Sequence, residues 1–149
     1  MQRWIILTVL TSALTGLTGV AAPAQADEPT PATTVTLGDA LIDPKIPGRV
    51  RVDVDYLCSV ADEARSLTVS VEQKDPDDNS VIAFGSSRTA EADVNCDGTA
   101  HHRQVLVQSK TTNWIPDADA VLTTTVSNIG ATPSAAADAK RAKLLATAP

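Results

Sequence analysis

Two adjacent histidines, His101 and His102, are the residues of this chain best suited to acid-base chemistry or metal binding. Imidazole titrates near neutral pH and is a common metal ligand. The flanking residues favour a strand, and adjacent side chains of a strand point to opposite faces of the sheet. The pair could share one ion only with a further ligand such as Asp93 or Asp97, and no spacing in the sequence requires that. We expect exposed strand histidines; a weak metal site is the alternative.

A cluster of carboxylates follows at residues 75–79. Asp75, Asp77 and Asn79 occupy positions one, three and five of a calcium-loop pattern. Position six is Ser80 in place of Gly, position twelve is not the bidentate Glu, and the proline after the first carboxylate suits a type I turn. The sequence therefore predicts a hairpin turn, with weak calcium binding as the alternative.

A catalytic nucleophile would have to be a hydroxyl, because the two cysteines are expected to pair with each other, and its base would be His101 or His102. The chain contains no Gly-x-Ser-x-Gly elbow. Its 18 acidic residues leave room for a carboxylate pair, but few aromatic residues are available to stack on sugar rings. The sequence assigns no catalytic residue, no metal ligand and no cofactor, and it does not predict an enzyme.

The first 26 residues have the three parts of a secretory signal peptide. Arg3 gives a cationic start, residues 4–20 are apolar, and Ala24 and Ala26 are the small residues that signal peptidase requires. The apolar stretch is diluted by Thr and Gly, is marginal for spanning about 30 Å of hydrocarbon, and is followed by no basic cluster. We predict cleavage after Ala26 and a secreted, extracellular protein that is not retained in the membrane.

Two cysteines remain after cleavage, Cys58 and Cys96. Thiols pair in the oxidising environment that an exported protein meets, so we predict one disulfide. Closing a loop of about 38 residues would stabilise the fold by roughly 4 kcal/mol in the chain-entropy model. A reactive or metal-binding thiol is the alternative, and the absence of a cysteine beside the cleavage site argues against a lipid anchor.

The composition of the mature chain limits its partners. Removing 26 of 149 residues leaves 123, which is enough for one domain with one core. Removing Arg3 leaves 11 basic against 18 acidic residues, a net charge of about −7. This sign opposes binding to nucleic acid and to anionic lipid. An extracellular protein or a cell-wall polymer remains as the expected partner, and the oligomeric state stays open.

The elements that must position these residues are strands, because apolar residues recur with a period of two across residues 35–129. The clearest case has Val50, Val52, Val54 and Tyr56 on one face and four charged residues on the other. Turn signals recur every eight to twelve residues, which is typical of a β-sandwich. We expect about seven antiparallel strands, at residues 35–42, 49–58, 67–72, 81–86, 92–96, 102–109 and 120–127.

The two ends of the mature chain are expected to lie outside this sandwich. Residues 27–34 form a polar, proline-containing leader, and the sandwich domain extends over residues 35–130. Residues 131–149 are rich in Ala with a few basic residues, and we expect a disordered tail or a short helix there. A basic cluster in this tail could contact an anionic wall polymer, although a solvated face is the simpler interpretation.

Trp114 and Phe84 are the candidate binding-surface residues. Trp114 is the only tryptophan after the signal peptide, and an exposed tryptophan in a loop is a frequent contact for a partner or a sugar. A sandwich with so few aromatic residues also needs them in its core, so a buried Trp114 is the favoured alternative. The hypothesis of an interaction surface predicts an exposed patch that contains Trp114 or the strand ending at Phe84.

Four motifs together resemble those of small secreted actinobacterial proteins with immunoglobulin-like sandwiches. They are a Tyr-x-Cys strand end at residues 56–58, a Val-rich strand finishing in Gln at residues 69–73, a Cys-x-Gly turn at residues 96–98, and a last strand introduced by an aromatic residue at 114 and an Ala. The resemblance implies an all-β, immunoglobulin-like antiparallel sandwich with one disulfide. That family is of unknown function, so the resemblance implies no activity. An antibody-type domain is excluded, because no Trp lies between the cysteines.

We therefore expect a secreted, non-catalytic extracellular binding or interaction module whose ligand the sequence does not identify. A carrier of an apolar small molecule is the first alternative and requires an open cleft between the sheets. A secreted hydrolase is the second, and it requires a His beside a carboxylate and a hydroxyl.

Overall fold

The computed structural model describes residues 32–60, 64–89, 93–128 and 134–147. All of them belong to one compact unit, residues 31–149. The predicted signal peptide, with Ala24 and Ala26, and residues 27–31 of the leader lie outside the described residues. In the described part, no helix is long and apolar enough to cross a membrane.

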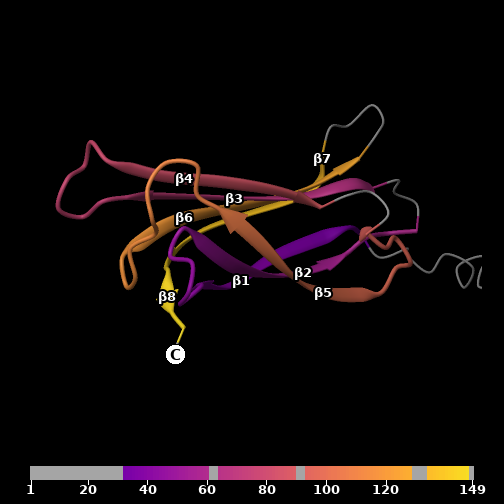
Figure 1. Ribbon diagram of the computed structural model, residues 1–149. Helices are drawn as coiled ribbons and strands as arrows, with labels where there is room; N and C mark the ends of the chain where they lie inside the picture. The colour runs from indigo at the N-terminus through magenta and orange to yellow at the C-terminus, as the bar shows by residue number, and fades with distance from the viewer. Residues whose placement is uncertain (1–31, 61–63, 90–92, 129–133, 148–149) are drawn as a thin grey trace, which may run out of the picture. The chain divides into compact units, whose positions relative to one another are not determined.

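The unit is built from two four-stranded sheets. Figure 1 shows the arrangement of their strands. The first sheet has the strand order β5-β2-β1-β8 and the second β4-β3-β6-β7. All neighbours are antiparallel except β1 and β8, which are parallel. The strands are β1 (Thr34–Ile42), β2 (Arg49–Leu57), β3 (Ala64–Lys74), β4 (Ile82–Thr89), β5 (Ala100–Gln108), β6 (Asp119–Asn128), β7 (Ser134–Lys143) and β8 (Leu145–Ala146).

The alternation read from the sequence produces the core. In β2, Val50, Val52 and Val54 are fully buried, while the charged residues between them are half-buried or exposed. Leu67 and Leu122 are equally buried on the facing sheet. A shift of one residue in the β2 register would bury charges, so the hydrophobic pattern fixes the pairing. The predicted all-β sandwich is confirmed.

One cluster of buried apolar residues fills the space between the sheets. Leu144, which links β7 in one sheet to β8 in the other, is fully buried in this cluster. The C-terminal strands therefore close one side of the core.

The prediction of a disordered tail or short helix at residues 131–149 is wrong for the described part of that segment. Ser134–Lys143 forms β7, which pairs with β6 along its length, and the chain then adds β8 to the other sheet. Ala136 and Ala142 face the core, while Ala137 and Ala139 face solvent. Because alanine occupies both faces, the period of two is invisible in the hydrophobic pattern, and the sandwich extends well beyond residue 130.

The predicted strand at residues 92–96 is also wrong for residues 93–96, which lie outside any strand. The Asn95 backbone N–H donates to the Tyr56 hydroxyl, and the disulfide holds Cys96. The segment is thus held by side chains in place of a strand neighbour, and residue 92 lies outside the described residues.

The two sheets meet at a corner where β4 approaches the end of β5. Gly85 forms a bridge with Ser109, and the Lys110 N–H donates to the Phe84 carbonyl oxygen. A Cβ atom on Gly85 would lie 2.5 Å from the Gln108 carbonyl oxygen. Glycine is therefore required for this close approach of two backbones.

Candidate functional site

The connections between strands gather at two ends of the sandwich. One end carries the connections from β2 to β3 and from β4 to β5, with the disulfide between them. The other end carries the turn between β3 and β4, the loop between β5 and β6, and the link from β7 to β8. The candidate residues divide between these two ends.

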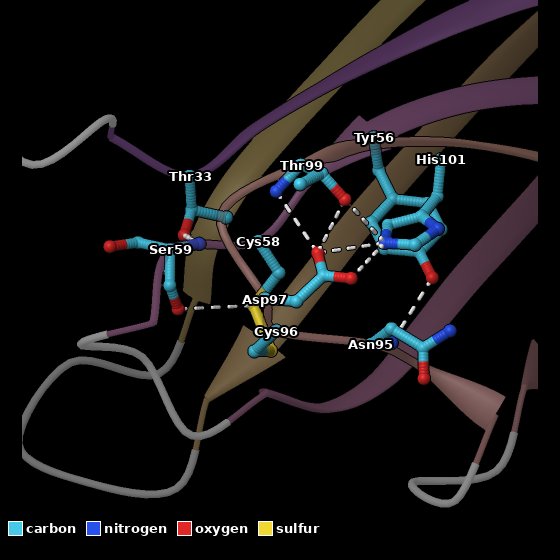
Figure 2. Close-up of a disulfide and its surroundings, with 9 residues drawn as sticks. All are labelled: Thr33, Tyr56, Cys58, Ser59, Asn95, Cys96, Asp97, Thr99 and His101. Atoms are coloured by element: carbon cyan, nitrogen blue, oxygen red, sulfur yellow. Dashed lines mark hydrogen bonds and ion pairs between the residues drawn. A yellow bond between two sulfur atoms is a disulfide. The ribbon is translucent and has the colours of Figure 1, made fainter.

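The predicted disulfide joins Cys58, just after β2, to Cys96, shortly before β5, with a Cα–Cα distance of 4.4 Å (Figure 2). The Gly98 N–H donates to the Cys58 carbonyl oxygen at 3.0 Å. Gly98 has a φ of 75°, a conformation that favours glycine, in agreement with the turn expected at residues 96–98. The disulfide thus anchors the turn that leads into β5.

His101 forms a compact cluster with Asp97, Thr99 and Tyr56 beside the disulfide (Figure 2). Its Nε2 atom lies 2.9 Å and 3.0 Å from the two carboxylate oxygens of Asp97, and its ring stacks on Tyr56 at a centroid distance of 5.4 Å. The Thr99 hydroxyl donates to Asp97 at 2.8 Å. The hydrogen bond with His101 and the Thr99 N–H and hydroxyl hold the pKa of Asp97 well below its usual value.

This cluster places a histidine beside a carboxylate and a hydroxyl, as the hydrolase alternative requires, but in the wrong arrangement for proton relay. A relay uses one ring nitrogen for the carboxylate and the other for the nucleophile. Here the carboxylate and the Thr99 hydroxyl both approach Nε2, and that hydroxyl already donates to Asp97. The arrangement is suited to fixing the turn.

His102 lies on the opposite face of β5, as the strand geometry predicts. Its Nδ1 atom is 2.8 Å from an Asp55 carboxylate oxygen, and its Nε2 atom is 3.7 Å from Asp53. The His102 side chain is 59% exposed, whereas that of His101 is only 26% exposed, so the prediction of exposed strand histidines is confirmed for His102 and wrong for His101. Among the described residues, no group of three or more His, Cys, Asp or Glu side chains is placed to hold a metal ion.

The acidic segment forms the predicted hairpin turn between β3 and β4. The Asp75 carboxylate accepts the N–H of Asp77 at 2.8 Å, and the Asp78 carboxylate accepts both the N–H and the hydroxyl of Ser80. The Ser80 hydroxyl, followed by its N–H, lowers the pKa of Asp78. Two of the carboxylates thus hydrogen-bond their own turn.

Trp114 is only 2% exposed and packs in the core, so the favoured prediction of a buried Trp114 is confirmed and its candidate role in a binding surface is wrong. Its backbone N–H donates to the Pro47 carbonyl oxygen, and its indole Nε1 has no hydrogen-bond partner in the described part of the chain. Because the chain has few aromatic residues, burial of the large Trp114 side chain contributes strongly to the core. Phe84, in contrast, is 39% exposed on β4 and remains available to a partner.

A groove of about 620 Å³ opens at the other end of the sandwich. Its floor is the outer face of β3, β6 and β7, and its walls are the β3–β4 turn and the loop before β6. The volume lies within the range of ligand sites. The lining residues are Glu72, Lys74, Asp75, Pro76, Asn79, Ile115, Pro116, Asp117, Ala118, Asp119, Ala120, Val121, Arg141 and Lys143.

One wall of the groove, the loop over residues 115–118, is held by Gln73 from inside the core. The Gln73 amide nitrogen donates to the carbonyl oxygens of Ile115 at 2.9 Å and Ala118 at 3.2 Å, and its oxygen accepts the Ile115 N–H at 2.8 Å. Gln73 is 2% exposed. These bonds satisfy three backbone groups of the loop, so its conformation is fixed before any ligand arrives.

Asp117, at the rim of the groove, has a φ of 62°. This left-handed conformation is unfavourable for residues other than glycine, although Asp adopts it more readily than most. The Asp117 N–H donates to the Leu144 carbonyl oxygen at 2.7 Å, and the Leu144 N–H donates back to Ala118 at 3.2 Å. Leu144, which links the two sheets, thereby holds Asp117 in this conformation. Strain of this kind is concentrated at functional sites.

This groove is not predicted by the sequence. Its clearest signal was Gln73, which follows Val69 and Val71 on the core-facing side of a strand and is a polar residue at an apolar position. A buried amide at such a position must find hydrogen-bond partners, and here they define the loop.

Comparisons of the chain with protein-family models, with curated proteins and with solved structures found no match.

Proposed function

We propose that the chain is an exported, non-catalytic binding module that uses the groove beside Asp117 to hold an extracellular partner. The observation that carries this proposal is the construction of the 115–118 loop, which Gln73 and Leu144 fix from two sides. A wall that is rigid before binding loses little conformational entropy when a ligand is bound.

An immunoglobulin-like assignment of the sandwich supports an interaction role. Strands β1, β2 and β5 pair as the A, B and E strands of that architecture do, and β3, β6 and β7 pair as C, F and G. Strand β4 lies beside β3, in the place of the C′ strand of variable-type domains. Loops at the ends of such sandwiches commonly carry function, and the groove lies at one end, opposite to the β2–β3 connection that corresponds to a partner-binding loop of variable-type domains.

Export is supported by the disulfide, since such bonds persist in oxidising compartments. The predicted signal peptide supports it independently. The carrier alternative receives less support, because packed apolar side chains occupy the space between the sheets and the groove lies on an outer face. The hydrolase alternative also receives little support, because the cluster at His101 is not arranged for proton relay.

The test is co-sedimentation of the purified, disulfide-bonded protein with wall and envelope fractions of the producing cells, and capture of secreted proteins from their medium. Arg141→Ala removes a charge from the groove, and Arg88→Ala removes one from β4 outside the groove lining and is the matched control. We expect saturable binding that Arg141→Ala weakens and Arg88→Ala leaves unchanged. Full recovery of the wild type in the supernatant without any captured protein, or equal binding by both variants, would overturn the proposal.

A further inference from the structure

The charged residues of the groove are arranged in two rows that run across sheet β4-β3-β6-β7. Strand register places Glu72 opposite Val121, and Val121 opposite Arg141. The next row places Asp119 opposite Lys143. The edge strand β7 thus contributes two cations, whereas the strands inside it contribute carboxylates, an apolar side chain and one further cation, Lys74 at the end of β3.

These charges are not used to hold the fold together. In the described part of the chain, no ion pair joins Glu72, Asp119, Arg141 or Lys143 to another residue. Asp117, on the rim, uses its backbone N–H and leaves its carboxylate without a hydrogen bond there. A ligand can therefore approach both signs of charge without first breaking an existing salt bridge.

The apolar part of the groove lies between the charges. Val121 is 41% exposed in the centre of the floor, and Ile115 and Pro116 line the wall beside it. A ligand with one apolar group between two charged ones would bury that group here, and burial of apolar area supplies most of the favourable free energy of association.

From this arrangement we infer that the groove binds a short, extended peptide that carries an acidic and a basic side chain on either side of an apolar one. Its carboxylate faces Arg141 and Lys143 on β7, its cation faces Asp119 and Glu72, and its apolar side chain covers Val121. A pure polyanion is a poorer match, because carboxylates line the groove beside the cations. The inference rests on the proposed function and specifies its ligand.

The test is selection of a random hexapeptide display library on the purified, disulfide-bonded protein, followed by calorimetric titration of the enriched peptides. We expect enriched sequences to carry both charges around an apolar residue, and raising the salt concentration from 0.1 M to 1 M to weaken their binding. Arg141→Ala should weaken it about twofold to fivefold, the range of an exposed ion pair, and Arg88→Ala should leave it unchanged.

A second variant tests the assignment of charges and does not depend on loss of binding. Asp119→Lys should shift the enriched set toward peptides with more acidic and fewer basic side chains. Enrichment of peptides lacking either charge, equal affinity for Arg141→Ala, or complete displacement by poly-glutamate would overturn the inference. If envelope binding or partner capture depends on Arg141 and no peptide is enriched, the inference fails and the proposed function stands.

Discussion

Replacing Gln73 with Met tests whether a single buried amide holds the groove loop. Methionine has a similar length and no hydrogen-bonding amide, so it preserves much of the packing of a residue that is 2% exposed. The change deletes three hydrogen bonds, of 2.8, 2.9 and 3.2 Å, and leaves the Ile115 N–H and carbonyl group without a partner, while the Ala118 carbonyl oxygen still accepts the Leu144 N–H.

A hydrogen bond contributes about 1 kcal/mol net, so we expect Gln73→Met to lower the free energy of unfolding by about 3 kcal/mol. Urea denaturation measures this loss. Gln104→Met is the matched control, because Gln104 is exposed on β5 and makes one side-chain hydrogen bond, to Asp53. The free energy of unfolding of the control should lie within about 0.5 kcal/mol of that of the wild type.

Hydrogen exchange then locates the effect. The Ile115 amide donates to Gln73 and should lose its protection from exchange in Gln73→Met. The amides of β2 should lose only as much protection as the lower global stability predicts. A variant that is as stable as the wild type, with the Ile115 amide still protected, would refute the view that Gln73 positions the loop.

Three further predictions concern the fold and its pH dependence. Replacing Cys58 and Cys96 with Ala should lower the free energy of unfolding by about 4 kcal/mol in urea, and a loss below about 1 kcal/mol would contradict the loop-closure account. Trp114→Ala should lower the free energy of unfolding by about 3–5 kcal/mol, and Trp114→Phe should lower it clearly less, because the phenyl ring fills more of the cavity while both variants remove the unpartnered indole N–H; equal losses in thermal unfolding would contradict this. The lowered pKa of Asp97 stabilises the fold above the unfolded pKa of about 3.9, and this contribution is lost as the pH falls toward the folded pKa. The stability difference between the wild type and Asp97→Asn should therefore narrow in denaturation curves below about pH 4, and a constant difference would show that the carboxylate charge is not responsible.

The apolar alternation in the sequence determined most strands and their inward faces. Val50, Val52 and Val54 can be buried together only if β2 lies with one face on the core, and the same holds for Val69 and Val71 on β3. The two cysteines likewise determined a disulfide, since no third thiol competes. These features depend on local pattern or on simple counting.

Only the tertiary structure decided what the C-terminal segment, Trp114 and the groove become. Alanine carries too little hydrophobic signal to mark a strand, so β7 is defined by its pairing with β6 and not by its own residues. The scarcity of aromatic residues favours a core position for Trp114, but its type also suits a surface, and only the fold, in which it is 2% exposed, decides for the core. The groove joins residues of β3, β6, β7 and two loops that are far apart in sequence, and strand register alone brings them together.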